Sequence, residues 1–148
     1  LKYKLVSNVK LDSLISPAVL SQAQAAVDAI SDSSLEWIKG NLNDLRMLLN
    51  MMKSGGAPDN ISDLLGEMAL EISGRAGTFG YSRASEIAYL LYLFCRNHCQ
   101  PMMPTHHTVI QKHVDVLQVI LGNQMRGSAG AIGQQVLDEL KSLTQKYS

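Results

Sequence analysis

The sequence predicts an all-α protein, an up-down-up-down four-helix bundle with an extra helix at each end. The chain has only four prolines in 148 residues, and it contains long stretches of helix-forming residues. Apolar residues recur at helical spacing in four consecutive long segments between about 32 and 125, and short loops separate these segments. Long helices joined by short loops pack as antiparallel neighbours. The length fits one domain, residues 1–148.

The N-terminal part of the chain is expected to contain an arm and one helix. Residues 1–15 alternate weakly without a helical period, which indicates an extended arm. Ser16 and Pro17 are typical of a helix start, with serine as N-cap and proline in the first helical position. We expect this helix to end at about Ile30, because the Ser-Asp-Ser-Ser sequence at 31–34 provides a break and a new cap. The residues expected to face the protein interior are Val19, Leu20, Ala23, Val27 and Ile30.

The bundle helices are delimited by turn-forming stretches. We expect them to span from the cap at 31–34 to about residue 53, then about 58–75, 82–97 and 106–125. The connecting segments contain glycine or proline, which favour turns. A further amphipathic helix is expected at about 131–146. The predicted core residues outside the second bundle helix are Leu35, Ile38, Leu42, Leu45, Leu49, Met52, Ile87, Leu90, Leu91, Phe94, Cys95, Val109, Ile110, Val114, Leu117, Ile120, Leu121, Ile132, Val136, Leu140 and Leu143.

The helix at 58–75 has an unusual residue on its polar face. With about 100° per residue, one apolar stripe forms within about 60° of its first member. Leu70 falls about 180° from that stripe, with Gly66 and Gly74 one turn away on either side. Glycine inside a helix costs about 1 kcal/mol against alanine, so two glycines here favour the close approach of a partner. The alternative is an ordinary exposed leucine. The stripe consists of Ile61, Leu64, Leu65, Met68 and Ile72.

The stretch from Leu70 to Tyr81, LEISGRAGTFGY, resembles the active-site segment of histidine-containing phosphotransfer (Hpt) domains. That family carries His-x-x-Lys-Gly, often followed by Gly-Thr-Phe-Gly-Tyr. The likeness is specific over residues 66–81 and weaker over about 35–125. The family histidine falls on Leu70, and the family lysine falls on Ser73. The residues that match in spacing and type are Gly74, Gly77, Thr78, Phe79, Gly80 and Tyr81.

The resemblance implies a four-helix fold and a place in a two-component phosphorelay, but without the family's chemistry. An Hpt domain takes a phosphoryl group from the aspartate of a receiver domain onto its histidine. Leu70 has no lone pair with which to form the phosphoramidate. Ser73 supplies a hydroxyl in place of the lysine cation. Arg75 is the remaining cation nearby, available to a phosphate or carboxylate or simply solvated.

We therefore expect a pseudo-Hpt protein that docks a response-regulator receiver domain or a sensor histidine kinase and is not an enzyme. No catalytic residue is expected. The predicted partner-binding residues are Gly66, Leu70, Ser73, Gly74 and Arg75.

Two alternatives stay open. One is an active phosphotransfer protein that uses another histidine, although none has small residues both four positions before and four positions after it. The other is a helical interaction module unrelated to phosphorelay. The other candidate histidines are His98, His106, His107 and His113.

Charge and composition argue against several other classes. Thirteen basic and thirteen acidic residues give zero net charge, so no basic footprint indicates nucleic acid. No apolar run of membrane-spanning length occurs. The first 15 residues lack the apolar core of a signal peptide, so Cys95 and Cys99 are expected to be reduced and the protein cytoplasmic. Cys95, His98 and Cys99 share one turn but do not follow a known zinc spacing, so we expect neither metal nor cofactor.

Overall fold

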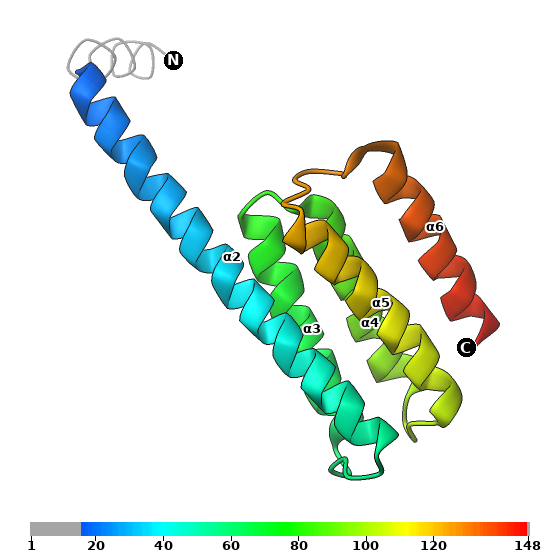
Figure 1. Cartoon of the computed structure of the whole chain (residues 1–148). Coiled ribbons are helices and arrows are strands. Elements are labelled where there is room, and N and C mark those ends of the chain that lie inside the picture. Colours follow the sequence, from blue (N-terminus) through cyan, green and yellow to red (C-terminus); the bar gives the residue numbers. More distant parts are fainter. Residues whose placement is uncertain (1–15, 148) are drawn as a thin grey trace, which may run out of the picture. The chain divides into compact units, whose positions relative to one another are not determined.

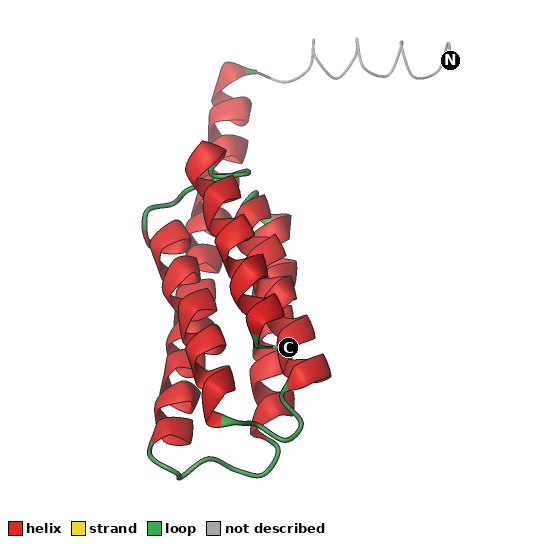
Figure 2. Ribbon diagram, turned by 90° about the vertical axis from the view of Figure 1, so that its right-hand side faces the viewer, coloured by secondary structure: helices red, strands yellow, loops and turns green. Residues whose placement is uncertain are grey.

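The computed structural model describes residues 16–147, and every regular element in that range is an α-helix (Figures 1 and 2). The predicted arm at 1–15 lies outside the described residues. Apart from the predicted break within α2, the helix ends shift by up to three residues from the sequence-based bounds. The helices are α2 (Pro17–Lys53), α3 (Ile61–Thr78), α4 (Ser82–His98), α5 (Pro104–Gly122) and α6 (Gly130–Lys146).

The predicted break at 31–34 is wrong, because α2 continues through it as one helix of 37 residues. Serine and aspartate lower helix stability only by tenths of a kcal/mol each, about 0.7 at most, and the stretch has neither glycine nor proline. The chain divides into two compact units, 1–33 and 34–148. In the first unit the described residues form this one helix, so its apolar residues have no core to enter. The prediction that they face inward is wrong, and Val19, Leu20, Ala23, Val27 and Ile30 are all exposed.

The second unit contains a four-helix bundle, made from the C-terminal part of α2 with α3, α4 and α5, and α6 packs against α4 and α5 (Figure 1). Side-chain contacts join α2 to α3, α4 to α5, and α2 to α5. Asn41 of α2 donates to Glu71 of α3 at 3.4 Å, and Phe94 of α4 meets His106 of α5 with ring centroids 5.6 Å apart. Lys53 at the end of α2 donates to Gln111 of α5 at 2.9 Å, which closes the ring.

The bundle core follows the predicted pattern closely. All six apolar residues predicted for α2 after the expected break are buried, as are all six predicted for α5. In α4 only Leu90 is half-buried rather than buried. The prediction is less accurate for α6, where Ile132 is exposed and Leu137 and Gly133 are buried instead.

The linker between α5 and α6 binds the turn between α3 and α4. The Gly127 amide donates to the Gly80 carbonyl at 2.7 Å, and the Arg83 amide donates to the Gly127 carbonyl at 2.9 Å. Gly80 has φ +88°, a conformation that favours glycine. Arg126 reaches back to the Phe79 carbonyl, at 3.0 Å, and so satisfies an acceptor at the C-terminal end of α3. The glycine-rich turn is therefore held by backbone contacts from a distant part of the sequence.

Candidate docking surface on α3 and α4

The core-facing side of α3 is turned toward α4 relative to the predicted stripe. Ile61, Leu65 and Ile72 are buried as predicted, whereas Leu64 and Met68 are only half-buried. Ala69 and Ala76, which the apolar stripe leaves out, are fully buried. The centre of the buried side lies about 60° around the helix from Ile61.

Small residues make the contact between α3 and α4. The Ser73 hydroxyl donates to the Ser85 carbonyl at 2.8 Å, and the Ser85 hydroxyl donates to the Ser73 carbonyl at 2.7 Å. A Cβ atom on Gly77 would lie 3.0 Å from the Ser85 hydroxyl oxygen, closer than such atoms normally come. Glycine at 77 therefore permits the close approach of the two helices.

Two of the five predicted partner-binding residues do not reach the surface. Ser73 is only 8% exposed, and its hydroxyl is engaged by Ser85. Gly66 is buried, because the Tyr92 ring and the Cys95 side chain lie over it. A Cβ atom on Gly66 would meet these two side chains at 3.6 and 3.7 Å. The prediction that Gly66 and Ser73 contact a partner is therefore corrected: both pack against α4.

Leu70 and Gly74 do form an exposed surface. Leu70 is 43% exposed, and nothing lies within 4 Å of the position that a Cβ atom on Gly74 would take. This confirms that Leu70 points outward and that the backbone one turn beyond it is bare.

A tyrosine of α4 lies at the same height as Leu70. The contacts Gly66 to Tyr92 and Ser73 to Ser85 fix the antiparallel register of the two helices. Leu70 lies midway between the first members of these pairs, and Tyr89 lies midway between the second. Tyr89 is also one helical turn from both Ser85 and Tyr92, so it lies on the side of α4 that faces α3. Tyr89 is 46% exposed, and we call Leu70, Gly74 and Tyr89 the Leu70 surface.

Arg75, the fifth predicted residue, lies at the opposite edge of α3. Its guanidinium carbon is 3.8 Å from the centroid of the Trp37 ring of α2, a cation–π contact. Glu71 is also on this edge, where it accepts from Asn41. Arg75 and Leu70 are about 140° apart around the helix axis. The structure thus separates the cation from the leucine that the sequence grouped with it.

An open hollow of about 410 Å³ continues the Leu70 surface toward the N-terminal end of α3. Its charged lining residues are Asp63 and Glu67 of α3 and Arg96 of α4. Arg96 donates to the Tyr92 hydroxyl at 2.7 Å, and Asp63 accepts from Gln100 at 2.8 Å. Glu67 is exposed one turn from Leu70.

The other histidines are placed unfavourably for phosphoryl transfer. His113 is fully buried, and its Nδ1 lies 2.8 Å from the Val109 carbonyl. His106 is 8% exposed, and its Nδ1 accepts the Met103 amide at 3.0 Å. His98, at the end of α4, and the half-buried His107 are more accessible, but both are at the opposite end of α4 and α5 from the glycine-rich turn.

The cysteines and histidines do not form a metal site in the described part of the chain. Cys95 and Cys99 are unpaired thiols with no exposed area. The hydrogen bond with the Cys99 thiol, and then burial, raise the pKa of Cys95 far above its usual value, so it is held as a thiol. Among residues 16–147 no group of three or more His, Cys, Asp or Glu side chains is positioned to hold a metal ion.

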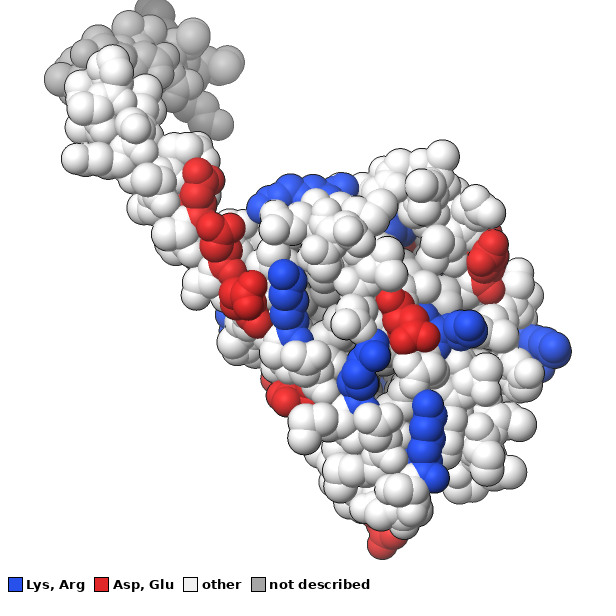
Figure 3. Space-filling view, in the orientation of Figure 1, with Lys and Arg blue, Asp and Glu red and all other residues white. Residues whose placement is uncertain are grey.

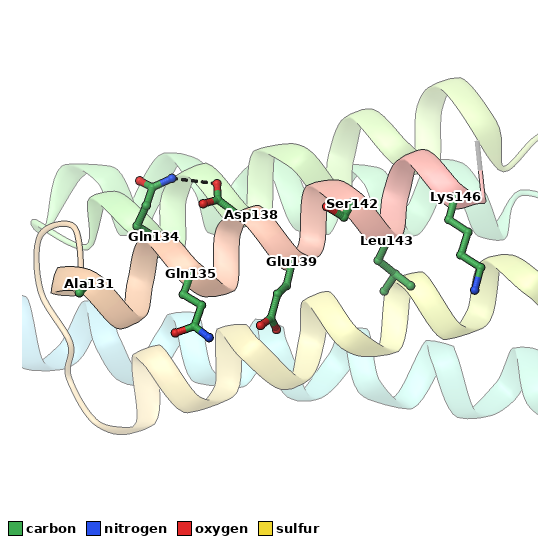
Figure 4. Close-up of a pocket in the computed structure, with 8 residues that line it drawn as sticks. All are labelled: Ala131, Gln134, Gln135, Asp138, Glu139, Ser142, Leu143 and Lys146. Carbon is green, nitrogen blue, oxygen red and sulfur yellow. Dashed lines mark hydrogen bonds between the residues drawn. The ribbon is translucent and has the colours of Figure 1, made fainter.

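Another surface hollow, of about 860 Å³, contains none of the predicted site residues. Its eight lining residues all come from α6 (Figure 4). Gln134 and Asp138 are hydrogen-bonded to each other at 2.9 Å on one side of the helix. A hollow lined by one helix has no second wall to enclose a ligand. We therefore do not regard it as a binding site.

Tyr89, Glu67 and Trp37 are surface residues that the sequence did not assign to the site. The signal for Tyr89 was available, since it is four residues after Ser85, which contacts α3. The four-residue spacing from Ser85 to Tyr89 indicates a position beside α3 only when the register of α3 and α4 is known. Trp37 is 36% exposed and lies beneath the Arg75 guanidinium.

Comparisons with known proteins do not assign a family. No protein-family model matches the chain, and no curated protein or solved structure is significantly similar to it. Among the described residues, no helix is both long and apolar enough to cross a membrane.

Proposed function

We propose that this protein is an Hpt-like signalling protein that docks a receiver domain through the Leu70 surface and carries no phosphate itself. The observation that carries the proposal is the position of Leu70. It occupies the place of the phosphoacceptor histidine in the segment that resembles Hpt domains, and its side chain is 43% exposed beside the bare backbone at Gly74.

The surroundings of Leu70 support docking rather than chemistry. Tyr89 adds an aromatic side chain at the same height, and tyrosine is enriched among the residues that dominate the affinity of protein interfaces. Neither Leu70 nor Gly74 provides a nucleophile, and the hydroxyl of Ser73 is buried in the α3–α4 contact. An all-α bundle of this kind gives the surface a rigid support, because Ser73, Ser85 and Gly77 fix α3 against α4.

The test is binding of purified receiver domains from the source organism to the parent protein and to Leu70→Asp. Burial of an exposed leucine contributes about 1.5–3 kcal/mol, and a carboxylate in an interface costs more. We expect Leu70→Asp to weaken binding about tenfold or more. The melting temperature should change little, because residue 70 points away from the core.

Val119→Asp is the matched control, since Val119 is also an exposed apolar residue, 57% exposed, on α5. We expect this variant to bind like the parent. Equal loss in both variants would show that added negative charge, rather than the Leu70 surface, is responsible. Binding to a histidine kinase but to no receiver would assign the surface to the kinase. Binding to neither would contradict the proposed function.

A further inference from the structure

We infer that the Leu70 surface distinguishes two states of its partner and binds an unphosphorylated receiver domain more tightly than a phosphorylated one. This inference rests on the proposed function. In that docking mode the receiver presents its phosphorylated aspartate to the residue at position 70. The inference therefore depends on what surrounds Leu70.

The immediate surroundings of Leu70 offer nothing that pairs with a phosphoryl group. Leu70 itself is apolar, and Gly74 has no side chain. The Ser73 hydroxyl, at the family's lysine position, is buried and donates to the Ser85 carbonyl. Removing a doubly charged group from water against an apolar side chain is costly unless a cation pairs with it.

Three cations of the described bundle, Arg75, Arg96 and Lys53, each contact another side chain. Arg75 stacks on Trp37 at the α2 edge of α3. Arg96 shares its hollow with two carboxylates, those of Asp63 and Glu67. Several Lys and Arg side chains lie across the α2 and α5 face (Figure 3), where Lys53 donates to Gln111 at 2.9 Å.

The charges nearest to Leu70 along α3 are negative. Glu67 is one turn before Leu70, and Asp63 is one turn before Glu67. Residues one turn apart have Cβ atoms about 5–6 Å from each other. The Debye length at physiological salt is about 8 Å, so Glu67 acts on a group at Leu70 with little screening. The Glu67 carboxylate thus repels a phosphoryl group at Leu70, whereas Asp63, two turns away and beyond the Debye length, contributes less.

The same surface suits the unphosphorylated state. The partner then presents an aspartate with a single negative charge to the Leu70 surface, instead of the roughly two charges of the aspartyl phosphate, so Glu67 repels it less. Phosphorylation of the receiver would then release the complex. The protein would then bind the unphosphorylated receiver selectively, without a covalent step of its own.

The experiment uses the receiver that binds the parent protein, with and without beryllofluoride, which mimics the aspartyl phosphate. Titration calorimetry measures both dissociation constants at about 0.15 M and about 1 M salt. We expect beryllofluoride to weaken binding about threefold or more at the lower salt concentration. The ratio of the dissociation constants with and without beryllofluoride should become smaller at high salt, where the Debye length is about 3 Å.

Glu67→Lys tests the origin of the discrimination. We expect it to reduce the beryllofluoride penalty or to reverse it. Glu139→Lys is the matched control, because Glu139 is an exposed carboxylate on α6 and the change in net charge is the same. This control should keep the penalty of the parent protein.

Equal or tighter binding of the beryllofluoride form by the parent protein would overturn the inference and leave docking itself intact. Tighter binding that disappears in Arg75→Ala would show that the guanidinium leaves Trp37 to meet the phosphoryl group. A penalty that Glu67→Lys leaves unchanged would overturn the electrostatic cause. Absence of binding in both states would overturn the proposed function and this inference with it.

Discussion

His113 is fully buried in the bundle core, with one of its ring nitrogens satisfied and the other without a partner. Nδ1 is 2.8 Å from the Val109 carbonyl, so this nitrogen carries the proton and donates. Nε2 has no hydrogen-bond partner within the described structure. Burial lowers the pKa of His113, although the bond to Val109 acts in the opposite direction. A neutral imidazole is therefore part of the folded core.

This burial predicts a loss of stability in acid. The unfolded chain binds a proton at His113 near the ordinary pKa of about 6.5, whereas the folded chain binds it only at lower pH. Burial also lowers the pKa of His106 and His107. The contribution of these neutral histidines to the free energy of unfolding is thus complete above about pH 6.5. It declines as the pH falls toward their pKa values in the folded protein.

Urea denaturation at about pH 7.5 and about pH 5.5 measures the effect as a smaller free energy of unfolding at the lower pH. His113→Leu should reduce the difference between the two conditions. His98→Leu, at an exposed position, serves as the control and should retain most of the difference in the free energy of unfolding between the two pH values. A parent protein equally stable at both pH values would contradict this assignment.

Leu70 and Ser73 show what a single side chain reveals about the candidate site. The outward direction of Leu70 follows from the spacing of apolar residues, and the structure confirms it. The burial of Ser73 does not follow from that spacing, because a serine on the polar face is expected to meet water. Its burial depends on Ser85, and that pairing requires the register of two helices.

At the scale of an element, α2 consists of two parts with different packing. Ile30 is 58% exposed, whereas Ile38, two turns further along the same helix, has no exposed area. We expect Ile38→Ala to lower the free energy of unfolding by about 2–5 kcal/mol. Ile30→Ala should change it by less than about 0.5 kcal/mol.

Chemical denaturation of the two variants, monitored by circular dichroism, compares the same substitution within one helix. Similar losses in both would show that residues 16–33 contribute to the folded core of the bundle.

The helices differ in how much of their packing the sequence predicts, and the difference has a physical reason. In α5 the buried residues are bulky and apolar, so their period marks the buried side directly. In α3 part of the buried side consists of Gly66, Ala69, Ser73 and Ala76, small residues to which a hydrophobic pattern gives little weight. The predicted buried side is therefore rotated away from α4. The spacing of these small residues would have indicated a close helix contact.

The same limitation applies to the predicted break in α2. Serine and aspartate at 31–34 are common at helix ends, yet they remain compatible with a helix interior. Whether such a stretch ends a helix depends on contacts that the local sequence does not contain. Apolar residues recur at helical spacing on both sides of residues 31–34. That spacing is expected for one continuous helix and for two separate helices, so it does not distinguish between them.

At the scale of the whole molecule, the glycine-rich turn has a structural task that does not depend on phosphate. Gly77 permits the contact with Ser85, and Gly80 has a positive φ. The α5–α6 linker binds the turn through Gly127, and Arg126 reaches the Phe79 carbonyl. These contacts explain why the Gly-Thr-Phe-Gly-Tyr segment fits here beside a leucine. In the proposed function the helices and the glycine-rich turn therefore serve for docking, although the phosphoacceptor histidine is absent.

Placing a histidine at position 70 tests whether the remaining structure still supports phosphoryl transfer. Leu70→His places an imidazole at an exposed position with bare backbone one turn beyond it. The fold should survive, because residue 70 does not enter the core. Ser73 is best left unchanged, because a lysine there would disrupt the hydrogen bonds with Ser85 and enter the α3–α4 contact.

The most direct measurement is transfer of radiolabelled phosphate from a phosphorylated receiver to the parent protein and to Leu70→His. The proposed function predicts no label on the parent and slow accumulation of acid-labile, alkali-stable label on Leu70→His. Acid-labile label on the parent protein would contradict the proposal that it carries no phosphate. A folded Leu70→His variant that binds the receiver but takes up no label would contradict the placement of residue 70 at the point of transfer.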